Sequence, residues 1–234
     1  MTQKSMARRL RLPQSKTLAL TLILFSSVFL TACEQLIMLQ MNNQTLTETK
    51  VKGDKLYLMG IINSKSYAQL KAVIANNPQV KTLVLTVMPG SIDDETNLQM
   101  CHYVRQQGLS TYLRSDSVIA SGAVDLFMSG VEREMESGAK LGVHSWGDGF
   151  KEALDYPRSA LEHKPYRDFY LAMVGSEDFY WYTLEAAKAD DIHWMSEVEI
   201  FTYPVLTQPI KAHKNHDPIF PEQEQMREEV LSDS

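Results

Sequence analysis

Two hydrophobic patterns alternate along the middle of the chain, one typical of buried strands and one typical of helices. Residues 55–62, 80–87 and 109–113 are apolar runs of strand length, and the second is apolar enough to be covered on both faces. Between them, residues 66–76 and 93–107 carry apolar side chains at helical spacing. This order predicts an α/β fold in which βαβ repeats build a mostly parallel sheet with flanking helices.

The remaining chain divides by composition. Residues 161–188 read as helical and are rich in aromatic side chains. From residue 206 onward proline and charge dominate, so residues 206–234 are expected to form a polar, flexible tail. Neither an internal repeat nor a second domain is visible, and we expect a single α/β domain over residues 55–205.

The first 32 residues read as a signal peptide, because a basic stretch precedes a short apolar run over residues 18–30. That run is too short to cross a bilayer comfortably, although a membrane-spanning anchor remains the alternative. It ends in Leu-Thr-Ala-Cys33, which resembles the lipobox of bacterial lipoproteins. The resemblance implies that Cys33 is acylated and that residues 33–54 form a tether. Since Glu34 and not Asp follows, it also implies an outer-membrane lipid anchor that faces the periplasm.

The net charge and the cysteine content limit which molecules and ions the chain is expected to bind. The chain has a net charge of −6, and residues 33–234 carry 18 Lys and Arg against 29 Asp and Glu, a net of −11. An acidic surface argues against nucleic acid as a partner. Once Cys33 is acylated, Cys101 has no intramolecular partner, and its apolar surroundings favour a buried core thiol over a catalytic one. The spacing of His and Cys residues predicts no metal site.

Four segments stand in an order that suggests a site: residues 87–91, 118–130, 139–145 and 189–196. Together they resemble the serine-peptidase branch of the superfamily that contains the Clp protease proteolytic subunit, signal peptide peptidase A and the crotonases. The resemblance covers residues 55–205. It implies a nucleophile at Ser121 in an Ala-Ser-Gly-Ala context and a base at His144, 23 residues later.

The resemblance also implies the rest of the site. The backbone N–H groups of Gly90 and Gly122 would form an oxyanion hole, although Pro89 stands where the family often has a second glycine. Asp191, with Asp190 beside it, would orient the imidazole.

Each of these residues also has a plain structural explanation. Ser121 could cap a helix, His144 could be a buried core histidine, and Pro89-Gly90 could be an ordinary turn. The two aspartates could be solvated charges at a helix end.

The functional hypothesis is therefore a membrane-anchored periplasmic serine hydrolase, an ATP-independent peptidase that uses an acyl-enzyme mechanism and no cofactor. Its partners would be membrane lipid through Cys33 and a peptide or unfolded protein as substrate, and the resemblance allows a homo-oligomer. Three alternatives stay open. They are a non-catalytic binding lipoprotein on the same fold, a crotonase-type thioester enzyme that needs coenzyme A, and an amphipathic structural lipoprotein.

Overall fold

The computed structural model describes residues 40–41 and 44–232, so the signal segment and Cys33 lie outside the described residues. The chain divides into two units, Met1–Gln40 and Met41–Ser234, and the fold belongs to the second. Among the described residues, we find no helix with the length and hydrophobicity needed to cross a membrane.

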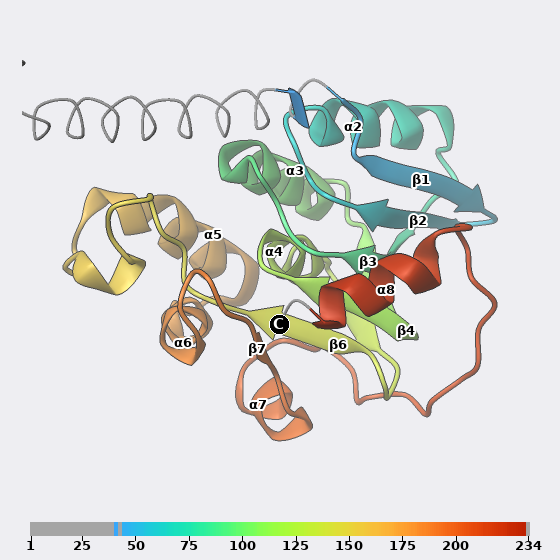
Figure 1. The fold of residues 1–234 in the computed structure, drawn as a ribbon. Helices are drawn as coiled ribbons and strands as arrows, with labels where there is room; N and C mark the ends of the chain where they lie inside the picture. Colours follow the sequence, from blue (N-terminus) through green and yellow to red (C-terminus); the bar gives the residue numbers. More distant parts are fainter. Residues whose placement is uncertain (1–39, 42–43, 233–234) are drawn as a thin grey trace, which may run out of the picture. The chain divides into compact units, whose positions relative to one another are not determined.

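A single seven-stranded sheet organises the domain (Figure 1). The strands are β1 (Thr47–Lys52), β2 (Lys55–Gly60), β3 (Thr82–Met88), β4 (Ser110–Ala120), β5 (Arg133–Met135), β6 (Lys140–Val143) and β7 (His193–Trp194). Their order is β1-β2-β3-β4-β6-β7, and β5 pairs with β4. The pairs from β2 to β6 are parallel, whereas β1 and β7 run antiparallel at the edges. The α/β fold with a mostly parallel sheet is therefore confirmed.

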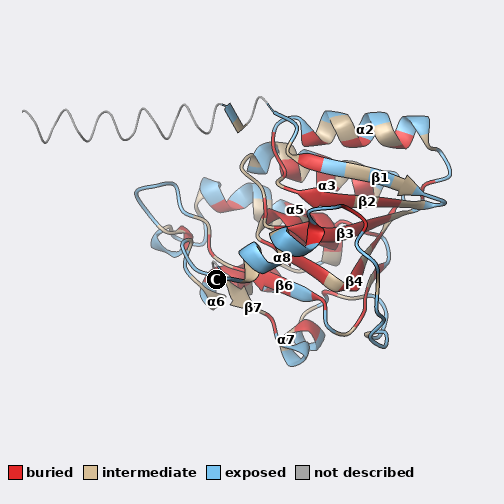
Figure 2. Ribbon diagram, turned by 45° about the vertical axis from the view of Figure 1, so that its right-hand side comes forward, coloured by how far each residue is buried: buried red, intermediate tan, exposed pale blue. Residues whose placement is uncertain are grey.

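Helices cover the sheet, and the strands form the buried centre (Figure 2). The helices are α2 (Ser66–Asn76), α3 (Asp94–Gln106), α4 (Gly122–Met128), α5 (Lys164–Val174), α6 (Asp178–Ala186), α7 (Glu197–Thr202) and α8 (Gln223–Ser232). The predicted helix over residues 161–188 is thus two helices. The reason is Gly175, which caps α5 in the left-handed conformation at φ 78° and turns the chain before α6 begins.

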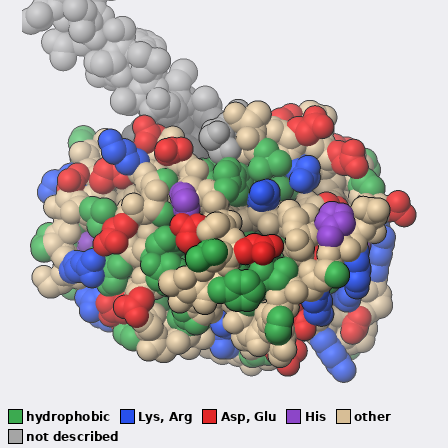
Figure 3. Space-filling model, turned by 90° about the horizontal axis from the view of Figure 1, so that it is seen from below, with side chains coloured by type: hydrophobic (Ala, Val, Ile, Leu, Met, Phe, Trp, Pro, Cys, Tyr) green, Lys and Arg blue, Asp and Glu red, His purple; other side chains and the backbone are tan. Residues whose placement is uncertain are grey.

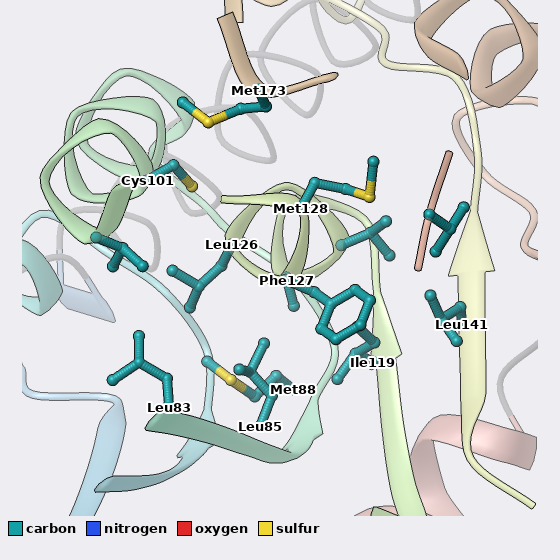
Figure 4. Packing of buried hydrophobic residues seen from close by; sticks show 14 of the residues in the cluster. Leu83, Leu85, Met88, Cys101, Ile119, Leu126, Phe127, Met128, Leu141 and Met173 are labelled. Carbon is teal, nitrogen blue, oxygen red and sulfur yellow. The ribbon is translucent and has the colours of Figure 1, made fainter. Parts of the chain in front are cut away.

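The alternation of side chains along the strands creates two separate cores. Leu58 faces the large cluster beneath the helices, whereas its neighbour Met59 faces a small cluster on the other side. In the large cluster, Phe127 of α4 packs among strand residues such as Leu85 and Ile119 (Figure 4). Cys101 is fully buried there, which confirms the prediction of a core thiol.

Strand β4 is longer than the sequence pattern suggests. The prediction ended at residue 113 because the next four residues are Arg-Ser-Asp-Ser, yet the strand continues to Ala120. The register between β3 and β4 shifts between Leu85 and Val87. Ser117 forms side-chain hydrogen bonds at this irregularity. Its Oγ accepts a hydrogen bond from Arg114 N at 2.9 Å and donates one to the Leu85 carbonyl at 2.6 Å. Side-chain hydrogen bonds therefore carry the strand through a polar stretch to the point where the site begins.

Two stretches that were expected to be polar appendages contribute to the fold. Part of the predicted tether forms the edge strand β1. The predicted flexible tail packs on the domain instead, because Ile219 and Phe220 join Met59 and Val87 in the small core. Helix α8 then lies against β3 and β4. The polar composition of this segment concealed two apolar side chains that cover the second face of the sheet.

Charged side chains of both signs are spread over the surface and are not gathered in one patch on the face shown in Figure 3. On the face in Figure 3, acidic side chains are scattered among apolar and basic ones. Several acidic side chains of the described residues form ion pairs, including Glu177 with Arg167 at 2.8 Å and Glu185 with Arg158 at 3.0 Å. Exposed pairs of this kind contribute little to stability, so the cores hold the fold together.

We expect Phe220→Ala to lower the free energy of unfolding by about 3 kcal/mol, because a buried phenyl ring is lost from a small core. Urea denaturation of the purified protein measures this. The matched control is Phe201→Ala, since Phe201 is 63% exposed and its loss should cost no more than about 0.5 kcal/mol. Equal effects of the two substitutions would contradict the packing of this segment.

Candidate functional site

Ser121 stands at the junction of β4 and α4 in a strained conformation. Its φ is 53° and its ψ is −133°, and it is the one non-glycine residue with positive φ in the described part of the chain. Its backbone N–H donates to the Gly142 carbonyl at 3.0 Å, but its side chain makes no capping hydrogen bond. Helix capping therefore does not account for this serine. Strain of this kind is maintained by the surrounding structure and concentrates at functional sites.

Gly90 lies directly against Ser121. Its φ is 143°, and a Cβ at this position would lie 2.9 Å from Ser121 Cβ and 3.3 Å from Ser121 Oγ. Only glycine fits such a close approach without displacing a neighbour. The Gly90 carbonyl accepts from Ile62 N at 2.9 Å, and within residues 44–232 we find no acceptor for the Gly90 N–H.

Gly122 is the first residue of α4, and the first N–H groups of a helix have no partner inside the helix. A Cβ at Gly122 would lie 2.5 Å from Ser91 Oγ and 2.8 Å from Asn97 Nδ2. The Asn97 side chain also donates to the Gly122 carbonyl at 2.9 Å, which fixes the peptide. Gly90 and Gly122 therefore both lie next to Ser121, and neither of their backbone N–H groups has an acceptor among residues 44–232.

His144 follows β6 at the same edge of the sheet. Because Ala120 of β4 pairs with Gly142 of β6, Ser121 and His144 both lie just beyond the ends of adjacent parallel strands. His144 Nδ1 is 2.7 Å from the Ser145 carbonyl. A carbonyl can only accept, so this contact places the proton on Nδ1 and leaves Nε2 as a base in the neutral ring.

Asp191 is not joined to His144. It is exposed, its Oδ1 accepts from Ile192 N at 2.8 Å, and it lines a groove on the surface with Glu152 and Lys188. Asp191 lies in the bend that precedes β7, outside the sheet. Asp190 is also exposed, and within residues 44–232 no carboxylate is hydrogen-bonded to the His144 imidazole.

The side chains of Ser121 and His144 line one pocket with Gly122. Its cavity of about 60 Å³ is several times the volume of about 10–15 Å³ that one water molecule needs. Aromatic residues form much of the wall, and these are Trp146, Tyr166, Tyr170 and Tyr180. The pocket suits a small group with one polar end.

Two carboxyl groups on the pocket were not found by sequence reasoning, Asp94 and Asp125. Tyr170 Oη donates to Asp125 Oδ1 at 2.5 Å, and Tyr166 Oη donates to Asp94 Oδ2 at 2.6 Å. Ser91 Oγ also donates to Asp94. The spacing of Tyr166 and Tyr170 on α5 is the signal that could have indicated them, since residues four apart share a helix face.

Burial sets the acidity of these groups. Desolvation raises the pKa of Asp125 to about 7, against the lowering effect of the Tyr170 hydrogen bond, and the charge of Asp94 raises it further. Desolvation and Asp125 likewise raise the pKa of the Tyr170 hydroxyl well above its usual value. At neutral pH the Asp125 carboxyl group is therefore protonated in part, whereas the Tyr170 hydroxyl keeps its proton. In the described ranges, no cluster of three or more His, Cys, Asp or Glu residues could hold a metal ion.

The chain is similar to several solved structures. No family model matches the chain, and no curated protein matches it. Among solved structures, methylmalonyl CoA decarboxylase is 11% identical with a TM-score of 0.46, covering 80% of this chain and 74% of that one. A putative enoyl-CoA hydratase/isomerase from Hyphomonas neptunium is 12% identical with a TM-score of 0.44, covering 80% and 75%. Human enoyl Coenzyme A hydratase domain-containing protein 3 is 9% identical with a TM-score of 0.46, covering 80% and 75%.

These similar structures share the ClpP/crotonase-like fold, and at such low identity the likeness concerns the fold alone. They are named as CoA enzymes and not as serine peptidases. That finding contradicts the predicted function as a serine peptidase, and the descriptions as a serine protease and a lipoprotein have no support from it. The membrane anchor at Cys33 and the periplasmic location stay predictions.

We expect Ser121→Gly to be more stable than Ser121→Ala by about 1 kcal/mol, because glycine adopts positive φ without strain and alanine does not. Chemical denaturation of the two variants at one pH measures the difference. A Ser121→Ala variant at least as stable as Ser121→Gly would show that the backbone at this junction is unstrained.

Asp125→Asn should gain stability relative to wild type as pH rises from 5 to 8, by on the order of 2 kcal/mol. Between the unfolded pKa near 3.8 and the folded pKa of about 7, the folded state holds a proton that the unfolded state has lost. Wild-type stability therefore falls with rising pH across this window, and the amide removes the effect. Thermal unfolding across the pH series measures it. Asp178→Asn, at an exposed position, is the control, and the same trend in both variants would contradict the burial effect.

Proposed function

We propose that this chain is an enzyme that binds a short acyl thioester and removes a proton from the carbon next to the carbonyl, without a covalent intermediate. The observation that supports this most directly is the pair of N–H groups at Gly90 and Gly122, which lie next to Ser121 and have no acceptor among residues 44–232. A carbonyl oxygen bound between them would receive two hydrogen bonds as negative charge develops on it. Donors that are already in position typically contribute about 3 kcal/mol each to such stabilisation.

His144 is the base in this proposal. Its Nδ1 proton is held by the Ser145 carbonyl at 2.7 Å, so the unprotonated Nε2 is free to accept the proton of the substrate. A histidine base suits reaction near neutral pH. The contact to a carbonyl orients the ring but supplies no negative charge, which fits a base in a reaction that needs no serine nucleophile.

The pocket limits the substrate. A cavity of about 60 Å³ accepts a short acyl chain and leaves the rest of the molecule outside. Thioesters are favoured over oxygen esters because their α-protons are more acidic and a histidine is a weak base. The partly buried Asp125, with a pKa of about 7, is neutral in part at physiological pH and then does not oppose a negative oxyanion.

We expect the purified protein to exchange the α-protons of S-propionyl-N-acetylcysteamine in deuterated buffer. Proton NMR measures this exchange as a loss of the α-proton signal. His144→Ala should slow the exchange by at least about 100-fold, because general base catalysis contributes about 10² to 10⁴. His213→Ala, which changes an exposed histidine, is the control and should exchange at the wild-type rate.

Ser121→Ala separates this chemistry from covalent catalysis. It should retain exchange within about fivefold, since the backbone N–H groups remain, and release of the free thiol should be slow in every variant. Exchange no faster than in buffer, or unaffected by His144→Ala, would contradict the proposed function.

A further inference from the structure

A buried hydrogen-bond chain lies behind the pocket and involves Trp146, His163 and Tyr180. Tyr180 lines the pocket, and its hydroxyl oxygen is 2.7 Å from His163 Nδ1 and 3.0 Å from Trp146 Nε1. An indole N–H can only donate, so one of the acceptor positions of the hydroxyl oxygen is already used. The direction of the contact with His163 decides where the proton of Tyr180 goes.

The surroundings of His163 decide that direction. The ring is fully buried, and its Nε2 has no hydrogen-bond partner among the described residues. A proton on Nε2 would leave a buried N–H without an acceptor, which is rarer and costlier in proteins than an acceptor without a donor. The proton therefore belongs on Nδ1, from which it donates to Tyr180. With Trp146 and His163 both donating to its oxygen, Tyr180 keeps its own O–H for a further acceptor.

We propose that the Tyr180 hydroxyl donates a hydrogen bond to a second oxygen on the acyl group of the substrate, and that His163 and Trp146 position it. The inference rests on the proposed function, in which the N–H groups of Gly90 and Gly122 already serve the carbonyl. A hydroxyl in a closed aromatic pocket is costly to leave unpaired, so it selects acyl groups that carry an acceptor. The substrate class is then a short hydroxyacyl or carboxyacyl thioester.

The packing of Tyr180 supports a fixed donor. Its ring stacks on Tyr166 with the centroids 5.6 Å apart and the planes 5° from parallel, and it also contacts Trp181 at 5.0 Å. Burial raises the pKa of Tyr180 to about 12, so the hydroxyl keeps its proton at physiological pH. A site that hydrogen-bonds a substrate hydroxyl discriminates strongly against the analogue that lacks it.

The first test reads the histidine directly. Two-bond proton–nitrogen NMR of the purified protein labelled with ¹⁵N-histidine should show His163 as the Nδ1–H tautomer. The signal that disappears in His163→Gln is assigned to His163. An Nε2–H tautomer would mean that Tyr180 donates to His163, and it would overturn the inference whether or not α-proton exchange occurs.

The second test compares two probes by ligand-observed NMR, S-3-hydroxypropionyl- and S-propionyl-N-acetylcysteamine. Wild type should bind the hydroxylated probe at least about tenfold more tightly, and Tyr180→Phe should lose this preference while it binds the propionyl probe as before. Near-UV circular dichroism verifies that the variant is folded. A preference that survives in Tyr180→Phe overturns the inference.

A matched pair of tryptophans tests the positioning. Trp146 and Trp181 both pack on the His163 ring, at 5.5 and 4.8 Å, but the Trp181 Nε1 donates to Glu177 at 3.2 Å and not to Tyr180. Trp146→Phe should therefore reduce the preference for the hydroxylated probe, and Trp181→Phe should leave it unchanged. Should the probe preference hold while no exchange is seen, the proposed deprotonation would fail and the binding role of Tyr180 would stand. Equal effects of the two tryptophan substitutions would overturn the positioning role.

Discussion

The site depends on one close approach, that of Gly90 to Ser121. Gly90 follows β3 and Ser121 follows β4, so the parallel pairing of these strands brings the two residues together at the same edge of the sheet. The missing side chain at Gly90 allows the contact, and the unusual backbone of Ser121 starts α4 with the Gly122 N–H beside it. A side chain at position 90 would push the two backbone segments apart and separate the donors.

Around this junction the pocket combines an aromatic wall with a few polar groups that neighbouring residues hold in place. Each polar atom has a neighbour that limits what it can do. The Ser145 carbonyl selects the tautomer of His144, Tyr170 holds Asp125, and His163 and Trp146 share the oxygen of Tyr180. Hydrogen bonds inside such a region are stronger than in water. These contacts fix which groups in the pocket donate and which accept hydrogen bonds.

The sequence predicted the parallel α/β architecture well, because the strand and helix patterns are local and strong. It also named Ser121, Gly122 and His144, which the structure brings to one pocket. It could not place Asp191, because this residue lies in a bend before β7, and a bend has no periodic pattern that indicates where its side chains lie. Asp94 and Asp125 were missed because their neighbours come from α5, far along the chain, and only the folded packing brings Tyr166 and Tyr170 to them.

The C-terminal segment has a consequence for biosynthesis. Ile219 and Phe220 cover Met59 and Val87, which belong to strands made much earlier. During translation the first face of the sheet can pack against its helices before Ile219 and Phe220, which follow every strand of the sheet, are available to cover the second face. The domain therefore completes its second core only after Ile219 and Phe220 have been made, and a chain that stops after β7 would leave the apolar side chains of Met59 and Val87 open to aggregation.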